Sequence, residues 1–341
     1  MEHSDAMPRV PTPTPSCGAL PVSRVAERSS FRHEALFYSD GDEGFLEGTL
    51  PLLEGAIEGG AAVLVAVGPE RAAALRETLG DRAARVGFAD MRRMGRNPAR
   101  IIPVWRQFLA EHGAGPLLGV GEPVWPGRSP AELSECERHE DLLNLAFDDG
   151  PPWRLLCPYD LDGLDDPVLE AAQRTHPLLA RDGKTEANWT YRGAHATPDP
   201  FAGGLPAPSA PVRERSFTGG DLAELRRLVS SWGKEESLGS EGSEELVLAV
   251  NELATNSVRY GGGGGTLRLW RDGETLLCEV QDDGRMDEPL VGRVRPAADV
   301  HNSRGVWIAN QLCDLVQIRS AATGTVVRVH KTLARPSGSG Y

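Results

Sequence analysis

Cysteine is scarce in this 341-residue chain, and no run of apolar residues is long. The five cysteines are scattered and odd in number, which argues against a secreted disulfide framework, and no CxxC pair points to zinc. No apolar run reaches about 18 residues, so we expect no membrane-spanning helix. The first residues lack a basic start followed by an apolar stretch and do not resemble a signal peptide. We therefore expect a cytoplasmic protein.

Positive charge is also in short supply, since 36 Lys and Arg residues stand against 49 Asp and Glu residues. The formal net charge of −13 argues against direct binding of nucleic acid or of an anionic membrane, because phosphate contacts need clustered basic residues. A hydrophobic fraction of 40% is nevertheless enough for packed cores. At ~150 residues per domain, the length indicates two domains.

Proline-rich segments divide the chain. Residues 1–29, rich in Pro, Ser and Thr, are predicted to be a disordered tail, and residues 336–341 a flexible one. Five prolines fall between Pro198 and Pro211 with few large apolar residues, which indicates a linker over 196–212. The resulting domains span 30–195 and 213–335.

Short apolar runs alternate with helical patterns before the linker. The runs typical of buried strands are EALFYS, AAVLVAV, RVGFAD, PLLGVG and WRLLCP. Between them, apolar residues recur at three-to-four spacing over 41–59, 69–80, 99–113 and 130–149. This order predicts an α/β fold with a mostly parallel sheet covered by helices, in which ligands tend to bind at the carboxyl ends of the strands.

The order of elements changes after the linker. Two helices, over 221–233 and 243–260, precede the strands TLRLWRD and TLLCEVQD, and an irregular segment follows from Gly284 to Ser303. A helix (GVWIANQLCD) and the strands LVQIRSA and TVVRVHKT close the chain. Helices on one side of an antiparallel or mixed sheet predict a two-layer α+β sandwich.

Two polar residues share one face of the second of these helices. Glu252 and Asn256 are four residues apart and therefore project from the same side, one turn apart. An amide oxygen can ligate Mg²⁺, and a carboxylate can orient an attacking hydroxyl or water. An isolated Glu…Asn pair is more often a solvated helix face, so this pair counts only together with the motifs that follow it.

Three further motifs lie downstream. The strand TLLCEVQD ends at Asp282, whose carboxylate can accept a hydrogen bond from an adenine amine, and Gly284 lets the backbone approach the ring. Arg304 and Gly305 open a helix whose exposed amides suit phosphate. Thr325 begins the last strand with a hydroxyl that can reach a base or a water. Taken singly, the first motif is most often a turn, the second is weak because it also fits an ordinary N-cap, and the third also fits a hairpin.

The order and spacing of AVNELATNSVRYG, VQDDG, SRGVWIANQLCD and GTVVRV resemble the GHKL ATPase family with its Bergerat ATP-binding fold. Within that family the likeness is to the anti-sigma-factor serine/threonine kinases of bacteria, and it covers about residues 213–333. The resemblance implies ATP and Mg²⁺ as cofactors, with Asn256 coordinating Mg²⁺ and Glu252 as the catalytic base or its orienter. The remaining nucleotide contacts that it implies are Asp282 with Gly284 for adenine, Arg304 and Gly305 for phosphate, and Thr325.

The sequence departs from the family pattern in the segment 285–304, which would be the lid over ATP. Met286 and Ser303 stand where the family has glycines near the two ends of this lid. The lid is thus poorer in glycine than usual, which leaves turnover of bound ATP open. The run Gly261–Gly265 follows a helix and lacks the Lys-Ser/Thr of a P-loop, so we interpret it as a flexible turn.

Residues 30–195 resemble the MEDS sensory domain, named for methanogen, methylotroph and DcmR proteins. The likeness lies in FRHEALFYSDGDEGFLEGTLPLLEGAIEGGAAVLVAV, in GVGEPVW and in LLCPYD followed by THP. It implies a signal-input role, with a small organic molecule as ligand. Five residues are predicted to meet at strand ends as a ligand or metal pocket: His33, Glu122, Cys157, Asp160 and His176. The alternative is a satisfied histidine at position 33 and a small buried cysteine at position 157.

Three functions remain open. The first is an anti-sigma factor that binds a sigma factor and transfers the γ-phosphoryl group of ATP to a serine or threonine of an anti-anti-sigma antagonist. The second is a sensor histidine kinase, for which ECERHEDLLNLA offers His139-Glu140 as a phosphoacceptor motif, although Pro151 and Pro152 separate that helix from the ATPase region. The third is a regulator that binds ATP without using it. A homodimer is compatible with each.

Overall fold

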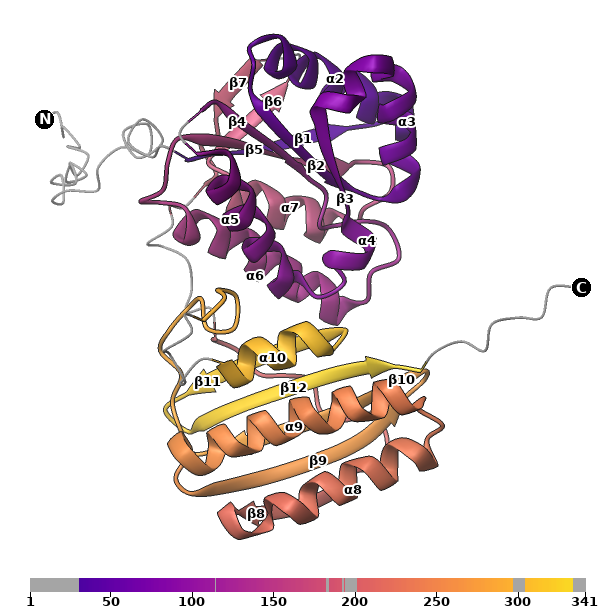
Figure 1. The fold of residues 1–341 in the computed structure, drawn as a ribbon. Helices are drawn as coiled ribbons and strands as arrows, with labels where there is room; N and C mark the ends of the chain where they lie inside the picture. The colour runs from indigo at the N-terminus through magenta and orange to yellow at the C-terminus, as the bar shows by residue number, and fades with distance from the viewer. Residues whose placement is uncertain are drawn as a thin grey trace, which may run out of the picture.

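The computed structural model describes residues 31–113, 115–181, 184–191, 193, 201–296 and 304–333. These residues form two β-sheets with helices packed against them, one above the other in Figure 1. Both predicted tails and the first part of the predicted linker lie outside the described residues. Within the described residues, no helix combines the length and the apolar character needed to cross a membrane.

Seven strands make up the N-terminal sheet, in the order β3-β2-β4-β5-β1-β6-β7. They are β1 (Phe31–Tyr38), β2 (Ala62–Val67), β3 (Val86–Asp90), β4 (Leu117–Gly121), β5 (Trp153–Asp160), β6 (Leu178–Arg181) and β7 (Lys184–Ala187). Every neighbouring pair is parallel except β6–β7. The five predicted strands and their mostly parallel sheet are confirmed. Sequence analysis missed β6 and β7, because four-residue strands with exposed positions carry no apolar run.

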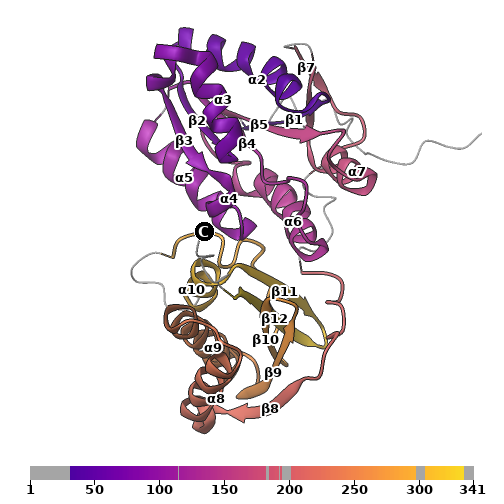
Figure 2. The ribbon, with the colours of Figure 1, turned by 90° about the vertical axis from the view of Figure 1, so that its right-hand side faces the viewer.

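Alternate residues of the N-terminal strands bury opposite faces of this sheet. In β5, Leu155 and Cys157 belong to one buried cluster and Leu156 to another. One face packs against α2 (Gly41–Glu58) and α3 (Pro69–Leu79), and the other against α5 (Ile101–His112), α6 (Pro130–Ala146) and α7 (Asp166–Thr175). Figure 2 shows helices on both sides of the strands. The elements that were not predicted are α7, α4 (Met91–Met94), η1 (Gly80–Arg85) and η2 (Pro98–Arg100).

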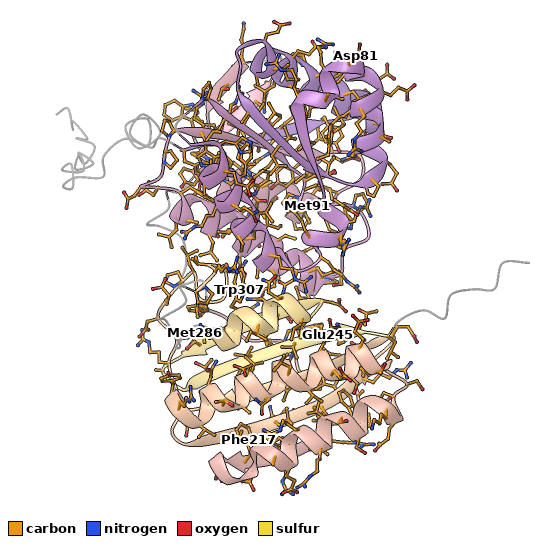
Figure 3. The ribbon with its side chains drawn as sticks, viewed as in Figure 1. Asp81, Met91, Phe217, Glu245, Met286 and Trp307 are labelled. Carbon is orange, nitrogen blue, oxygen red and sulfur yellow. The ribbon has the colours of Figure 1, made fainter. Side chains whose placement is uncertain are left out.

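Five antiparallel strands make up the C-terminal sheet, in the order β11-β12-β10-β9-β8. They are β8 (Arg213–Thr218), β9 (Gly264–Asp272), β10 (Thr275–Asp282), β11 (Leu315–Ala321) and β12 (Gly324–Thr332). The covering elements are η4 (Gly219–Asp221), α8 (Leu222–Glu235), α9 (Ser240–Tyr260) and α10 (Arg304–Leu312). The predicted two-layer α+β sandwich is confirmed. Its edge strand β8 was not predicted, because only Phe217 of its residues is buried (Figure 3).

The buried face of α9 anchors the helices of the C-terminal half. Leu246, Val250 and Leu253 are at most 3% exposed and pack in one cluster with Trp232 of α8 and with residues of β9 and β10. Their spacing of four and three residues places them on one side of the helix, as predicted. This packing fixes the rotation of α9 about its own axis. Glu252 and Asn256 lie beside the buried stripe and are half-buried.

Replacing Leu246 by alanine is expected to lower the free energy of unfolding of the C-terminal half by about 2–5 kcal/mol, because the truncation leaves a cavity in the core. Leu248 lies two residues further along the same helix and is 45% exposed, so Leu248→Ala is the matched control, with an expected change within about 0.5 kcal/mol. Urea denaturation followed by tryptophan fluorescence measures both. Equal losses in the two variants would contradict the assigned face of α9.

Candidate functional site

Asn256 and the start of α10 are in direct contact. A side chain at Gly305 would place its Cβ 2.8 Å from Nδ2 and 3.3 Å from Oδ1 of Asn256. A larger residue at position 305 would therefore displace this carboxamide from the first turn of α10. The contact joins the amide expected to ligate Mg²⁺ to the helix end expected to hold phosphate. Glu252 precedes Asn256 by one turn on α9 and is half-buried.

Asp282 ends β10 with both of its carboxylate oxygens oriented by neighbours. Its Oδ2 accepts a hydrogen bond from Ser257 Oγ (2.5 Å), and its Oδ1 accepts one from the Gly284 amide (2.9 Å). A carboxylate has about four lone-pair positions, so acceptor capacity for an adenine amine is left. A side chain at Gly261 would overlap the Asp282 carboxylate, which makes glycine necessary there. Sequence analysis missed Ser257, although a buried hydroxyl on a helix calls for a partner.

A chain of hydrogen bonds connects the ends of β10, β11 and β12. The Met286 amide donates to Ser320 Oγ (2.9 Å), and Thr325 Oγ1 donates to the Gly284 carbonyl (2.8 Å). The two hydroxyl oxygens lie 2.8 Å apart, and Ser320 is the donor between them because the Thr325 proton is already used. Thr325 thus holds the backbone of Gly284 beside Asp282. The sequence did not point to Ser320, whose place depends on the register between β11 and β12.

The first part of the predicted lid packs onto the C-terminal half. Met286, which replaces a family glycine, rests against the buried cluster (Figure 3). Gly292 has a φ of 68° and approaches Val306 so closely that a Cβ would come within 2.5 Å of its Cγ1. Asn310 Nδ2 of α10 donates to the Gly292 carbonyl over 3.0 Å. Ser303, the other replaced glycine, lies outside the described residues.

The glycine run 261–265 connects α9 to β9. Gly262 and Gly263 have φ values of 91° and 98°, which glycine adopts without strain. Gly264 and Gly265 already belong to β9. The predicted turn is therefore limited to the first three glycines of the run, and the last two begin the strand.

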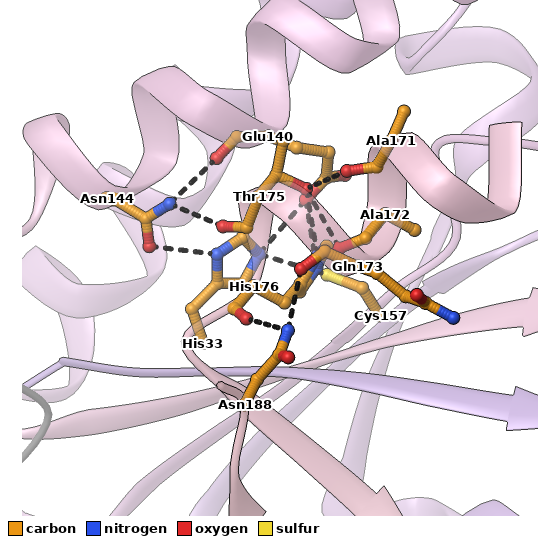
Figure 4. A network of polar contacts seen from close by, with 10 residues as sticks. All are labelled: His33, Glu140, Asn144, Cys157, Ala171, Ala172, Gln173, Thr175, His176 and Asn188. Atoms are coloured by element: carbon orange, nitrogen blue, oxygen red, sulfur yellow. Dashed lines mark hydrogen bonds and ion pairs between the residues drawn. The ribbon is translucent and has the colours of Figure 1, made fainter. Parts of the chain in front are cut away.

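In the N-terminal half, four side chains from distant elements meet in the core (Figure 4). His33 of β1, Cys157 of β5, Glu140 of α6 and His176, which follows α7, are each at most 2% exposed. Their potential ligating atoms lie within 4.8 Å of one another. Three of the four belong to the pocket predicted from the sequence. Glu140 was missed as a member, because it was interpreted only as part of a His-Glu motif.

The two other residues of that predicted pocket lie in a separate group. Glu122 and Asp160 each pair with Arg71, the latter over 3.6 Å. Both stand at the carboxyl ends of their strands, whereas His33 and Cys157 lie within theirs, on the face covered by α6 and α7. The expected five-residue pocket at the strand ends is therefore corrected to a buried cluster of four residues and a distinct ion-pair group.

Two family models match the chain. Residues 32–177 match the model of the MEDS domain, the MEthanogen/methylotroph, DcmR Sensory domain, and residues 216–331 match the model of the Histidine kinase-like ATPase domain. The chain joins a MEDS domain to a histidine kinase-like ATPase domain. The antiparallel sheet of the ATPase domain, with its helices on one side, agrees with a GHKL-type sandwich. No curated protein shows a significant match to the chain.

Two solved structures are similar to parts of the chain. The crystal structure of the RsbU and RsbW domains of Rv1364c from Mycobacterium tuberculosis is 18% identical, with a TM-score of 0.30, and the match covers 37% of this chain and 33% of that one. The chain thus spans about a third of the length of that protein. The Acinetobacter baumannii histidine kinase AdeS is 9% identical, with a TM-score of 0.22 and coverages of 37% and 70%.

The MEDS domain holds the C-terminal end of α10. Arg100 donates to the carbonyls of Asn310 and Cys313, both over 2.6 Å. Asn97 Nδ2 adds hydrogen bonds to the carbonyl and to Oδ1 of Asn310, each of 3.1 Å. A cation at a helix C-terminus satisfies carbonyls that lack a partner within the helix and interacts favourably with the helix dipole. The helix whose first turn lies against Asn256 is therefore fixed at its other end by the MEDS domain.

The segment predicted to be the lid also touches the MEDS domain. Leu290 packs against a buried cluster of the MEDS domain, and Arg293 lies 3.5 Å from Glu135 of α6. Glu135 is 2% exposed and also pairs with Arg319 of β11 over 2.9 Å. Burial lowers the pKa of Arg293, and the charge of Glu135 acts against this shift. A buried guanidinium needs such a partner, so the lid depends on α6 for its charge balance.

His139, the candidate phosphoacceptor of a histidine kinase, is buried in the MEDS domain. It is 1% exposed, and its Nδ1 has no hydrogen-bond partner among the described residues. Burial lowers its pKa to about 3. A phosphoacceptor must be reached by the γ-phosphoryl group of ATP, so the structure does not fit His139 in that role.

The buried His139 is expected to make stability depend on pH. Its pKa falls from 6.5 to about 3 on folding, so the unfolded state takes up the proton first as the pH drops. Neutral His139 makes its full contribution to the free energy of unfolding at pH values above 6.5. This contribution declines as the pH falls from 6.5 towards 3. At about pH 5, roughly 2 kcal/mol is lost. His139→Gln should remove this part of the loss, and the exposed His112→Gln should keep all of it. The part that comes from His33 and His330, whose pKa burial also lowers to about 4, stays in both variants. Urea denaturation at about pH 7 and about pH 5 measures the difference; an unaltered loss in His139→Gln would rule the explanation out.

Gly305→Ala tests the contact between α10 and Asn256. The added methyl group would displace the carboxamide, so affinity for Mg-ATP should fall by about tenfold or more, equivalent to about 1.4 kcal/mol. Gly239→Ala is the matched control, because this position has φ −55° and no atom within 4 Å of an added Cβ. Isothermal titration calorimetry compares the two variants with the wild type. Wild-type affinity in Gly305→Ala would show that the contact is not part of the nucleotide site.

Proposed function

We propose that this protein is an anti-sigma factor with an ATP-dependent serine/threonine kinase domain that is controlled by its MEDS domain. The observation that carries the proposal is the contact of Asn256 with the first turn of α10, one helical turn from Glu252, inside a histidine kinase-like ATPase domain. The resemblance of AVNELATNSVRYG and the following motifs to the anti-sigma kinases supports this choice among ATPases.

The residues around this contact fit a triphosphate with Mg²⁺. Asn256 offers an amide oxygen to the metal ion. The first turn of α10 offers its N–H groups, the positive end of its dipole and the charge of Arg304 to phosphate oxygens. Gly305 keeps the backbone close to Asn256, so metal and phosphate ligands face the same space. When bound, Mg²⁺ supplies neutralisation of the charge on the phosphate groups.

The strand ends fit the adenine base. Asp282 keeps acceptor capacity for the exocyclic amine, and its orientation is fixed by Ser257 and by the Gly284 amide. Thr325 donates a hydrogen bond to the Gly284 carbonyl. We therefore propose that it acts on nucleotide binding indirectly, by positioning the Gly284 backbone. Base and phosphate are thus assigned to two ends of one site.

Glu252 is the proposed catalytic base. A carboxylate one turn from the metal ligand can take the proton of a serine or threonine hydroxyl as its oxygen attacks the γ-phosphorus. The bond between the γ-phosphorus and the bridging β–γ oxygen breaks, and ADP leaves with that oxygen. The hydroxyl belongs to an anti-anti-sigma antagonist, while the sigma factor is held inactive by binding. ATP and both partners place the reaction in the cytoplasm, and a homodimer is compatible with it.

Signal input is proposed to reach the ATP site through the contacts between the two domains. A MEDS domain over 30–195, joined by a linker over 196–212 to an ATPase domain over 213–335, fits this arrangement. Arg100 acts on the end of α10, and Glu135 acts on Arg293 of the lid. A small molecule bound to the MEDS domain would alter phosphoryl transfer by shifting these contacts.

A regulator that binds ATP without turnover is the second candidate. Met286 favours it, because its side chain is packed on the core at the start of the lid, where the family has a glycine. A lid anchored in this way has less freedom to close over phosphate than a glycine-rich one.

Radiolabelled ATP, the purified chain and a candidate antagonist separate the alternatives. Asn256→Ala should abolish Mg-ATP binding or label transfer with the fold intact, and Glu252→Ala should slow transfer more than it weakens ATP binding. Asn251→Ala is the matched control on α9, since Asn251 binds Arg226 instead of facing α10.

The position of the label decides the outcome. Label on a serine or threonine of the antagonist supports the kinase. Acid-labile label on the chain itself would instead indicate a histidine kinase, and binding without transfer would indicate the regulator. Transfer by Asn256→Ala at the rate of Asn251→Ala would contradict the assigned site.

A further inference from the structure

A cluster of four metal-ligating groups in the MEDS domain has no part in the proposed kinase reaction (Figure 4). Glu140 Oε2 lies 3.0 Å from His33 Nε2 and 3.3 Å from His176 Nε2. Cys157 Sγ lies 3.5 Å from the same atom of His33. The four side chains come from β1, β5, α6 and the segment after α7, so only the complete fold brings them together.

The hydrogen bonds around the two histidines fix the place of their ring protons. Asn144 Nδ2 donates to the carbonyl of Thr175 (2.8 Å), which leaves its Oδ1 facing His33 Nδ1 at 3.1 Å. His176 Nδ1 lies 2.8 Å from the carbonyl of Ala172. Both partners are acceptors, so each Nδ1 carries the proton and each Nε2 presents a lone pair towards the cluster.

Both lone pairs face the Glu140 carboxylate, and that of His33 also lies 3.5 Å from Cys157 Sγ. Glu140 Oε1 and His176 Nε2 have no hydrogen-bond partner among the described residues. Apart from the Cys157 S–H, a weak donor 3.5 Å from His33 Nε2, these buried groups are acceptors that repel one another, and a cation would satisfy them together.

We propose that His33 Nε2, His176 Nε2, Cys157 Sγ and the Glu140 carboxylate bind one divalent transition-metal ion, with Zn²⁺ as the fitting ion. Tetrahedral zinc with bonds of about 2.0–2.3 Å separates its ligand atoms by roughly 3.3–3.8 Å. Three of the spacings in the cluster are 3.0, 3.3 and 3.5 Å, and all of them lie within 4.8 Å. Side-chain adjustments of about 1 Å or less therefore bring the four atoms to tetrahedral spacing. Two imidazoles, a thiolate and a carboxylate form a donor set that suits zinc.

The surroundings of the cluster are those of a metal centre. Ligating histidines donate their other ring N–H to a fixed acceptor, here Asn144 for His33 and the Ala172 carbonyl for His176. Burial raises the pKa of the Cys157 thiol, so its proton is present until an ion arrives. Binding then forms the metal–sulfur bond and releases that proton to solvent.

A cavity of about 320 Å³ borders the cluster between α6 and α7. Glu140 and Tyr159 line it together with apolar residues such as Leu133 and Val168. The Tyr159 hydroxyl is buried and has no hydrogen-bond partner among the described residues. The cavity therefore gives an ion a way to Glu140 and leaves space for a small molecule beside it.

Titration of the full chain with Co²⁺ in the absence of nucleotide tests this site independently of the kinase function. We expect one equivalent of bound Co²⁺ with a thiolate-to-cobalt charge-transfer band and the intense visible bands of a tetrahedral site. One equivalent of Zn²⁺ should displace it. X-ray absorption of the zinc form should show one sulfur and two imidazoles around the metal.

Two cysteine variants make the assignment specific. Cys157→Ser should remove the charge-transfer band and weaken Zn²⁺ binding by about 100-fold or more. Cys136 of α6 is also 1% exposed, so Cys136→Ser is the matched control and should keep the band. Glu140→Gln should keep the band and weaken binding.

Three results would overturn the proposal. They are a wild-type chain that binds no stoichiometric Co²⁺ or Zn²⁺, a zinc shell without sulfur, and an unchanged charge-transfer band in Cys157→Ser. If Cys157→Ser does not fold, the X-ray absorption of the wild-type zinc form decides by itself.

Discussion

The position of α10 is the constraint on which the proposed function depends. At its first turn, Gly305 lies against the Asn256 carboxamide, where an added Cβ would collide. At the last turn of α10, Arg100 and Asn97 of the MEDS domain donate hydrogen bonds to backbone carbonyls of the helix end. The helix has only nine residues and is hydrogen-bonded at its C-terminal end, so a displacement of one end also moves the other end. The proposed nucleotide site and the MEDS domain therefore meet on a single short element.

Helix α6 of the MEDS domain contacts both the buried four-residue cluster and the ATPase domain. Its start is fixed by a capping box between Ser129 and Glu132, in which each side chain bonds the backbone of the other. From the middle of the helix, Glu140 points into the buried cluster. One and a half turns earlier, Glu135 reaches Arg293 of the lid. The residues of the proposed metal site and of the contact with the predicted lid are thus carried in part by the same helix.

The main elements could be predicted because burial follows from periodicity, as in β5 and α9. The strands β6, β7 and β8 could not, since short exposed strands gain their stability from pairing with neighbours. The order of the motifs was enough to propose Asn256 and Asp282 for one site. Ser320 could not be predicted, because its position beside Thr325 depends on the register between β11 and β12. Glu140 meets His33 across 107 residues of sequence, a proximity that no local pattern contains.

Hydrogen–deuterium exchange of the full chain with and without Mg-ATP tests the central claim most directly. Binding of nucleotide at the first turn of α10 stabilises the whole helix and the contacts at its far end. We predict slower exchange in 304–312 and also in 96–102 of the MEDS domain, around Asn97 and Arg100. Protection confined to the ATPase domain, with 96–102 unchanged, would contradict the account.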